Sequence, residues 1–275
     1  MTTRAAMVDR VDPLMLAFCR VIVPAILLFP VVWRRGIIPR NASIPAVIMM
    51  ALGWGLPYPL ITGFGLQTVP ASLFAPLTPG LAPILIALLS VAFLGEHLRG
   101  EIIAGLVLIG MSLALVIGNW VLEADHEALR GAVWLIAGSF AFAVYNVNFQ
   151  RSGLSPVEAT AYVALWSLPL VLPFYWLRPE ALSGFSAGEW AFHLIVQGLL
   201  SGLVAGIAYA LAIRHLGTVR GSMVNALMPV ISALAGIWIL GERLGAAGWA
   251  AIVLASLGVA AANGAFRRWR PAGSG

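Results

Sequence analysis

Residues 81–114 read LAPILIALLSVAFLGEHLRGEIIAGLVLIGMSLA, and residues 227–260 read LMPVISALAGIWILGERLGAAGWAAIVLASLGVA. The two stretches align without gaps at an offset of 146 residues, and 12 of the 34 aligned positions are identical. Leu and Ala match by chance in apolar sequences, but both stretches also share the order Pro, eleven residues, Gly-Glu, one residue, Leu. An offset of 143 further pairs Pro13 with Pro156, Pro30 with Pro173 and Trp33 with Trp176. The chain therefore contains an internal repeat, which indicates a fold built from two copies of one unit.

The composition places the repeat in a membrane. Hydrophobic residues make up 61% of the 275 residues and charged residues 10%, whereas soluble domains average about 45–50% and about 25%. This excludes a soluble globular enzyme, a disordered chain and a fibrous protein, because so little polar surface cannot keep a particle of this size in water. All 16 basic residues are Arg and the net charge is +5. They are scattered between apolar runs, which is typical of charges that set membrane topology and not of a nucleic-acid-binding surface. The single cysteine, Cys19, excludes an internal disulfide.

Nine apolar runs are long enough to cross the hydrocarbon core, which takes about 20 residues of helix. They are 13–33, 44–64, 70–94, 102–122, 131–149, 157–177, 190–213, 219–240 and 246–266. The sequence therefore predicts an all-α integral membrane protein, a multi-span helical bundle. When the connection after the first run is placed in the cytoplasm, ten Arg lie on that side and five on the other. This distribution predicts a cytoplasmic C-terminus in the inner membrane of a bacterial-type cell.

The repeat also predicts how the two halves are related. Runs 70–94 and 219–240 are five crossings apart, an odd number, so the repeats lie inverted in the membrane, as in many secondary transporters. The first repeat covers 1–122 with four spans, 123–130 forms an external connection, 131–266 is the second repeat with five spans, and 267–275 is a cytoplasmic tail. Run 131–149 has no counterpart in the first half. Either the protein has nine spans and an external N-terminus, or this sequence begins one helix late. We expect the second, because five plus five spans are symmetric.

Three motifs resemble a known family. The first runs from Val69-Pro70-Ala71-Ser72 through Pro83 to Leu94-Gly95-Glu96. The second, its counterpart in the other repeat, runs from Arg214-His215-Leu216-Gly217 through Pro229 to Leu240-Gly241-Glu242-Arg243-Leu244. The third runs from Val11-Asp12-Pro13-Leu14 to Cys19-Arg20. The first two resemble the paired EamA domains of the drug/metabolite transporter superfamily, and the third resembles the start of that family's second helix. The resemblance covers about 11–266. It implies a ten-helix inverted-repeat exporter of amino acids, metabolites or drug-like solutes, whose first helix, absent here, normally helps to line the central cavity.

Polar residues at membrane depth are functional candidates by default, and helical spacing groups several of them on shared faces. Trp54 and Tyr58 share a face with Thr62, and His193, Gln197 and Ser201 are spaced four residues apart. Ser222 and Asn225 fall in one wedge of about 80° with Pro229 and Ser232. We predict that ten residues bind substrate: Trp54, Tyr58, Tyr145, Asn146, His193, Gln197, Ser201, Ser222, Asn225 and Arg20. A lining of amides, hydroxyls and aromatic rings suits a neutral or zwitterionic solute with an apolar side chain, and we favour an aromatic amino acid.

Each candidate also has a structural interpretation. Ser, Asn and Gln side chains join membrane helices, and an interfacial position is the main alternative for His193. Arg20, whose repeat partner is Val163, anchors a substrate carboxylate, forms an ion pair within the bundle, or extends to the interface. Glu96 and Glu242 follow Gly and precede a helix, so we expect both to cap helices on opposite sides of the membrane.

The chemistry that the sequence lacks narrows the function further. No Asp or Glu lies in the middle of a span, and without Lys there is no phosphate-binding loop for ATP. No catalytic set of Ser, His and Asp and no metal-binding His pair lies at membrane depth, so we expect no enzyme, no cofactor and no metal. We predict a secondary transporter that exports amino acids or related small metabolites by alternating access; the alternative is a non-transporting or truncated, inactive membrane component. The expected partners are membrane lipid and the small-molecule substrate, without nucleic acid, and the expected state is a monomer or weak homodimer.

Overall fold

A computed structural model describes residues 13–39, 42–177, 185–240 and 245–264, and these residues form helices and connecting loops without a β-strand. Two expectations, the cytoplasmic tail 267–275 and the cap at Glu242, lie outside the described residues. The chain divides into two compact units, which are described separately. The first unit comprises Met1–Phe64 and Val144–Arg214, and the second comprises Gly65–Ala143 and His215–Gly275.

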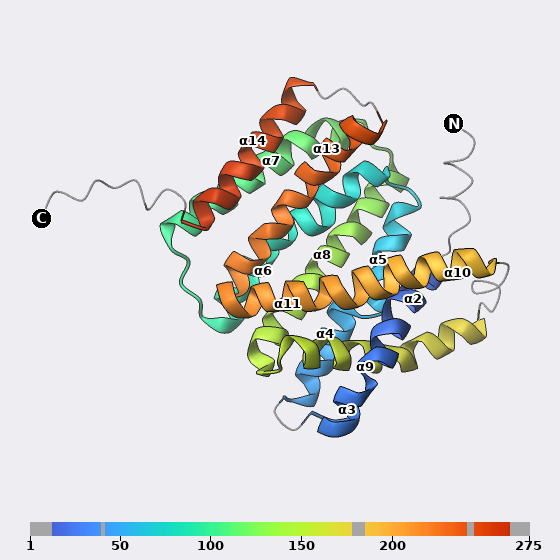
Figure 1. Ribbon diagram of the computed structural model, residues 1–275. Coiled ribbons are helices and arrows are strands. Elements are labelled where there is room, and N and C mark those ends of the chain that lie inside the picture. The colour runs from blue at the N-terminus through green and yellow to red at the C-terminus, as the bar shows by residue number, and fades with distance from the viewer. Residues whose placement is uncertain (1–12, 40–41, 178–184, 241–244, 265–275) are drawn as a thin grey trace, which may run out of the picture. The chain divides into compact units, whose positions relative to one another are not determined.

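The helices follow the predicted apolar runs (Figure 1). The first unit is built from α2 (Pro13–Leu27), α3 (Phe29–Arg35), α4 (Ile44–Trp54), α5 (Pro57–Leu66), α9 (Pro156–Leu177), α10 (Ala187–His193), the π-helix η4 (Leu194–Val204) and α11 (Ala205–Leu216). The second is built from the 3₁₀-helix η1 (Ala71–Leu73), the π-helix η2 (Pro76–Gly80), α6 (Ala82–Leu94), α7 (Gly100–Glu123), α12 (Thr218–Ser222), the 3₁₀-helix η5 (Met223–Leu227), α13 (Met228–Leu240) and α14 (Ala246–Ala262). Helix α8 (His126–Ser152) is divided between the units, and the last two residues of α5 and of α11 belong to the second unit.

Six stretches among the described residues are long and apolar enough to cross a membrane. They are Ile44–Leu66, Pro76–Leu94, Gly100–Gly118, His126–Ser152, Ala187–Leu216 and Thr218–Ala235. A seventh forms if α2 and α3, which meet at a bend of 56°, are counted as one span. The fold is therefore an all-α membrane bundle, as predicted, while nine spans stay a prediction.

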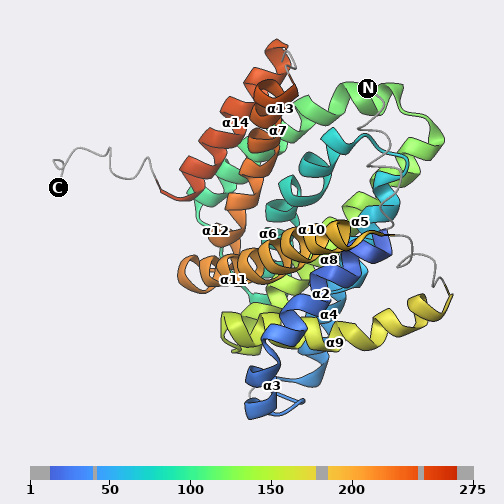
Figure 2. The same cartoon turned by 45° about the vertical axis from the view of Figure 1, so that its right-hand side comes forward.

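Each compact unit contains both copies of the same repeated helices. In the first unit α2 packs against α9, and the offset of 143 aligns these two helices. In the second unit α7 packs against α14, which the offset of 146 aligns, and the two run side by side in both views (Figures 1 and 2). The units thus cut across the two sequence halves: each combines matching helices from the first and second repeat.

Small residues allow the helices of the second unit to approach closely. A β carbon on Gly105 of α7 would lie 2.6 Å from the carbonyl oxygen of Gly258 in α14, and a β carbon on Gly258 would lie 2.8 Å from that of Gly105. The Ser112 hydroxyl donates to the Ala251 carbonyl oxygen at 2.7 Å across the same pair of helices. Membrane helices associate through such small-residue contacts, because lipid provides no hydrophobic force between them.

The first unit uses the same device between α2 and η4. A β carbon on Gly198 would lie 2.7 Å from the carbonyl oxygen of Cys19, and one on Gly202 would collide with the carbonyl oxygen of Arg20. Gly198 and Gly202 are four residues apart, the spacing of a small-xxx-small contact. This approach brings Ser201, which lies between them, to the side chain of Arg20.

One expected helix cap is wrong. Helix α7 begins at Gly100 with Arg99 as its N-cap, so Glu96 lies outside the first turn. Gly95 instead ends α6 in a left-handed conformation with φ of 66°, and the backbone N–H of Glu96 donates to the Ser90 carbonyl oxygen at 3.3 Å. The Gly-Glu pair therefore terminates the preceding helix. Partial burial raises the pKa of the Glu96 carboxyl above its ordinary value.

The close packing of α2 on η4 predicts that Gly202→Ala destabilises the protein. The added methyl group has no space beside the Arg20 carbonyl, so we expect a loss of about 1–3 kcal/mol in the free energy of unfolding in detergent. Gly118→Ala is the matched control, because a β carbon there meets no atom within 4 Å. Equal stability of the two variants would contradict the packing.

Candidate functional site

Arg20 is the centre of the candidate site in the first unit. It lies in α2, is partly buried, and its Nη1 donates to the Ser201 hydroxyl at 2.9 Å. Its guanidinium carbon lies 4.3 Å from the centre of the Trp54 ring and 5.7 Å from that of Tyr58. Both contacts fall within the range of cation–π attraction. Arg20 therefore packs against side chains of α4, α5 and η4, which favours a role inside the bundle over extension to the membrane interface.

A break between α4 and α5 places the two aromatic rings beside this charge. Trp54 ends α4 and Tyr58 lies in the first turn of α5. At the break, the Leu56 N–H donates to the Ser167 hydroxyl oxygen at 3.2 Å, and the Ser167 hydroxyl donates to the Val163 carbonyl oxygen at 2.7 Å. The ring centres of Trp54 and Tyr58 are then 4.9 Å apart. Ser167 of α9 thus supports the backbone where it leaves the regular helix.

Helix α8 extends the aromatic surface. The Tyr145 ring centre lies 6.0 Å from that of Trp54, and Phe149 stacks on Tyr145 at 5.9 Å with an angle of 3° between the rings. The Arg214 guanidinium lies 4.4 Å above the centre of Phe149. The result is a row of three rings with an arginine at each end. We use the name arginine–aromatic cluster for these side chains and their polar neighbours: Arg20, Trp54, Tyr58, Tyr145, Phe149, Ser201, Tyr209, Asn146 and Arg214.

The two arginines of the cluster differ in what their donors bind. Nη2 of Arg214 donates to the carbonyl oxygens of Phe149 in the last turn of α8 and of Leu154 just after that helix, so this side chain holds backbone in place. Arg20 binds only one neutral hydroxyl among the described residues, and no carboxylate of those residues pairs with it. A cation among apolar helices without a counter-ion is costly. The paired donors of a guanidinium match a carboxylate in geometry and charge.

Tyr209 joins the cluster through Asn146. The Tyr209 hydroxyl donates to Oδ1 of Asn146 at 2.8 Å, and the Tyr209 ring centre lies 6.5 Å from that of Trp54. Tyr209 was not among the predicted residues. It continues the series 193, 197, 201 by two further steps of four, so extending that series along the helix was the signal available in the sequence.

The space beside Arg20 is small. A cavity of about 20 Å³ is lined by Arg20, Val21, Pro24, Trp54, Gly55, Thr160, Val163, Ala164 and Gly202. This is room for roughly one water molecule. An amino acid does not fit, so the cluster is closed in this conformation. Val163, the repeat partner of Arg20, lines the same cavity.

Two predicted residues lie on the same helix as Ser201 but outside the cluster. Gln197 makes no side-chain hydrogen bond with another described residue, and its role stays a prediction. His193 ends α10 eight residues before Ser201, its ring contacts Phe192 at 5.3 Å, and its Nδ1 is buried without a hydrogen-bond partner among the described residues. The helix between them is a π-helix, which winds with more residues per turn than the α-helix that the spacing argument assumed.

Ser222 and Asn225 belong to the second unit. The Ser222 hydroxyl donates to the Val219 carbonyl oxygen at 2.7 Å, and the side-chain nitrogen of Asn225 is buried without a hydrogen-bond partner among the described residues. The single wedge expected for Ser222, Asn225, Pro229 and Ser232 assumed a continuous α-helix. The 3₁₀-helix η5 interrupts it between α12 and α13, so the spacing of 100° per residue fails here. Their part in binding stays a prediction.

The fold and the repeat define the class as a helical integral membrane protein built from two related halves. The chain matches the EamA-like transporter family over residues 2–118 and 129–264, and it belongs to that family. It is 22% identical over 242 residues to the Uncharacterized transporter YoaV of Bacillus subtilis, covering 85% of this chain and 81% of the relative. It is 26% identical over 296 residues to the Uncharacterized transporter YwfM of the same organism, covering 98% and 91%.

Two further comparisons add to this. The chain is 24% identical over 209 residues to a protein of Streptantibioticus cattleyicolor named Probable terminal-alkyne amino-acid exporter, covering 74% of this chain and 68% of the relative. A protein of known crystal structure shares the fold, with a TM-score of 0.72, 20% identity and coverage of 97% of this chain and 93% of that one. The chain is thus a membrane transporter by family, which favours transport over catalysis.

The contact between Arg20 and Ser201 predicts energetic coupling. A double-mutant cycle of Arg20→Gln and Ser201→Ala measures this coupling by unfolding in detergent. We expect the double variant to lose about 1 kcal/mol less free energy of unfolding than the two single variants lose together. Ser152→Ala is the control partner, because its hydroxyl donates to Phe149 within its own helix. Additive effects for the Ser201 pair would show that the hydrogen bond contributes nothing.

Proposed function

We propose that this chain is a secondary transporter that exports amino acids or closely related zwitterionic metabolites by alternating access. The observation that carries the proposal is the guanidinium of Arg20, held among apolar helices on the face of Trp54 without a carboxylate partner among the described residues. The transporter family supports the general function. The relative named Probable terminal-alkyne amino-acid exporter supports the substrate class.

Each part of an amino acid has a chemical counterpart in this proposal. The carboxylate binds Arg20 in a bidentate, charge-assisted contact. An apolar or aromatic side chain packs on Trp54, Tyr58 and Tyr145. Polar groups near the ammonium come from Oδ1 of Asn146, which is an acceptor, and from the Tyr209 hydroxyl. Gln197, Ser201, His193, Ser222 and Asn225 complete the predicted binding set.

Substrate binding requires the cluster to open. With room for roughly one water beside Arg20, the described conformation fits an occluded, empty state. Exchange between such a state and open ones is the expectation for alternating access in a repeat-built transporter. Inner-membrane location with a cytoplasmic C-terminus, transport without ATP, and a monomer or weak homodimer remain part of the proposal.

Replacing the charge of Arg20 should reduce export strongly. For Arg20→Gln, we expect efflux from cells loaded with amino-acid dipeptides to fall about tenfold or more, because the carboxylate loses its ionic partner. The control is Arg151→Gln, an exposed arginine at the end of α8, which should export normally at equal expression.

The same assay distinguishes the alternative, a non-transporting membrane component. If cells that contain the folded wild-type protein release no amino acid faster than cells without it, the transporter proposal is wrong for this chain. If they do, but Arg20→Gln exports like wild type, transport stands and the role of Arg20 is wrong.

Two neutral polar residues provide a separate prediction. Gln197→Ala and Asn225→Ala should each reduce efflux several-fold at unchanged expression, since both side chains are predicted to contact the solute. Asn263→Ala is the control, because this exposed amide donates to the Val259 carbonyl oxygen at 2.9 Å within its own helix end. Normal efflux by both variants would contradict the predicted contact of Gln197 and Asn225 with the solute.

A further inference from the structure

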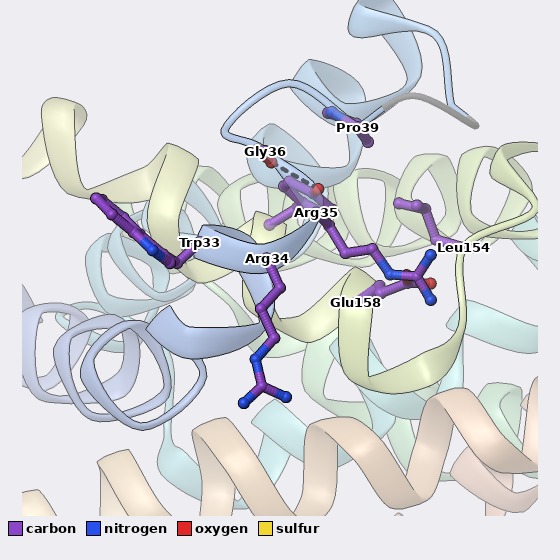
Figure 3. A pocket seen from close by; sticks show the side chains of 8 residues that line it. Trp33, Arg34, Arg35, Gly36, Pro39, Leu154 and Glu158 are labelled. Carbon is purple, nitrogen blue, oxygen red and sulfur yellow. Dashed lines mark hydrogen bonds and ion pairs between the residues drawn. The ribbon is translucent and has the colours of Figure 1, made fainter.

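A second cavity in the first unit is not used by the proposed transport site. It has a volume of about 340 Å³ and lies where the end of α3 meets the start of α9 (Figure 3). Its lining consists of Trp33, Arg34, Arg35, Gly36, Pro39, Leu154, Glu158 and Tyr162. Pockets that bind small molecules have volumes from about 300 Å³ upward.

The walls of this pocket are held by hydrogen bonds between the α3 end and α9. The Tyr162 hydroxyl donates to the Gly36 carbonyl oxygen at 2.8 Å, drawn as a dashed line in Figure 3, and Nε1 of Trp166 donates to the Ile37 carbonyl oxygen at 3.2 Å. Gly36 turns the chain out of α3 with φ of 93°, a conformation that favours glycine. The pocket is therefore a formed feature of the unit.

The charge inside the pocket is positive. Glu158 is neutralised: one oxygen binds Nε of Arg35 at 3.1 Å, and the other accepts the Ser155 N–H at 2.9 Å in a reciprocal helix cap. The side chain of Arg35 is 64% exposed, so its guanidinium stays accessible to a ligand beside Glu158. Arg34 points away from this pair in Figure 3 and has no carboxylate partner among those residues. The sum of the three charges is +1.

Apolar side chains surround these charges. Trp33 is 75% exposed, Ile37 67% and Ile38 56%. Phe29 and Trp33 are one turn apart on α3 and contact each other at 5.8 Å between ring centres. Helix α3 bends 56° away from α2 and combines Phe29 and Trp33 with Arg34 and Arg35. Aromatic and basic residues together are typical of a segment at the membrane interface.

We propose that this pocket binds the headgroup of an anionic phospholipid. The phosphate takes donors from the terminal amino groups of Arg35, Arg34 adds a second positive charge at the pocket wall, and Trp33, Ile37 and Ile38 contact the acyl chains. Basic pockets between helices at the membrane surface suit this ligand, and the apolar rim distinguishes it from a soluble phosphate. The site does not depend on which solute the transporter carries.

Native mass spectrometry of the purified full-length protein tests the site, with phosphatidylglycerol and phosphatidylcholine of identical acyl chains. We expect wild type to retain phosphatidylglycerol preferentially. Arg34→Gln with Arg35→Gln should weaken its binding about tenfold or more, at about fivefold per arginine. Arg130→Gln is the matched control, an exposed arginine that pairs with Glu127 outside the pocket, and it should bind like wild type.

Glu158→Gln provides a test of opposite sign. It removes the negative charge and releases Arg35, so we expect phosphatidylglycerol to bind several-fold more tightly. This variant keeps the proposal testable if the double arginine variant does not fold. Equal binding of the two lipids, unchanged binding by the double variant, or weaker binding by Glu158→Gln would overturn the proposal. If sn-glycerol 1-phosphate binds as tightly as the lipid, the pocket takes a soluble anion and the lipid assignment is wrong.

Discussion

A guanidinium group inside a bundle of apolar helices needs compensation for the water it has lost, and the first unit is organised around this requirement at Arg20. Trp54 offers the negative face of its ring, and Ser201 offers a hydroxyl oxygen. Both depend on departures from regular packing: the helix break before Leu56 turns the Trp54–Tyr58 pair toward the charge, and Gly202 lets η4 approach the Arg20 backbone. Neutral groups compensate only part of the cost, and we propose that an anion supplies the rest.

The repeat explains why this arrangement is asymmetric on a symmetric scaffold. Repeat-related helices pack together within each unit, α2 with α9 in one and α7 with α14 in the other. Position 20 and its repeat partner, position 163, therefore line the same cavity, one with Arg and the other with Val. The repeat-related helices form a framework that is close-packed through glycine. Within it, the charge of the site comes from the difference between Arg20 and Val163. At the α3 end the two copies also meet, since Arg35 of the first copy pairs with Glu158 of the second.

The sequence predicted the helical membrane class and the family, because apolar runs and a repeat are direct consequences of lipid and of duplication. It also selected Arg20, Trp54, Tyr58, Tyr145, Asn146 and Ser201, which the structure brings into one cluster. It missed Tyr209, although this residue continues the four-residue spacing of 193, 197 and 201. It also missed the binding of Arg214 to backbone carbonyl oxygens, because such long-range contacts leave no periodic signal. The wedge of Ser222 and Asn225 rested on continuous α-helical geometry, which the 3₁₀-helix η5 interrupts, and the spacing of His193, Gln197 and Ser201 falls on the π-helix η4. The Gly-Glu pair at 95–96 ends a helix where it was expected to begin one. Where the chain departs from regular helix, side-chain direction follows from tertiary contacts and not from spacing.

The central claim is that Arg20 binds the carboxylate of the transported solute. The most direct test compares binding of two ligands to purified protein: the amino acid exported fastest, and the amine that lacks only its carboxylate. Wild type should prefer the amino acid by about tenfold or more, and Arg20→Gln should lose this preference while its affinity for the amine stays the same or rises. A variant that binds both ligands more weakly by the same factor, or that keeps the wild-type preference, would contradict the claim.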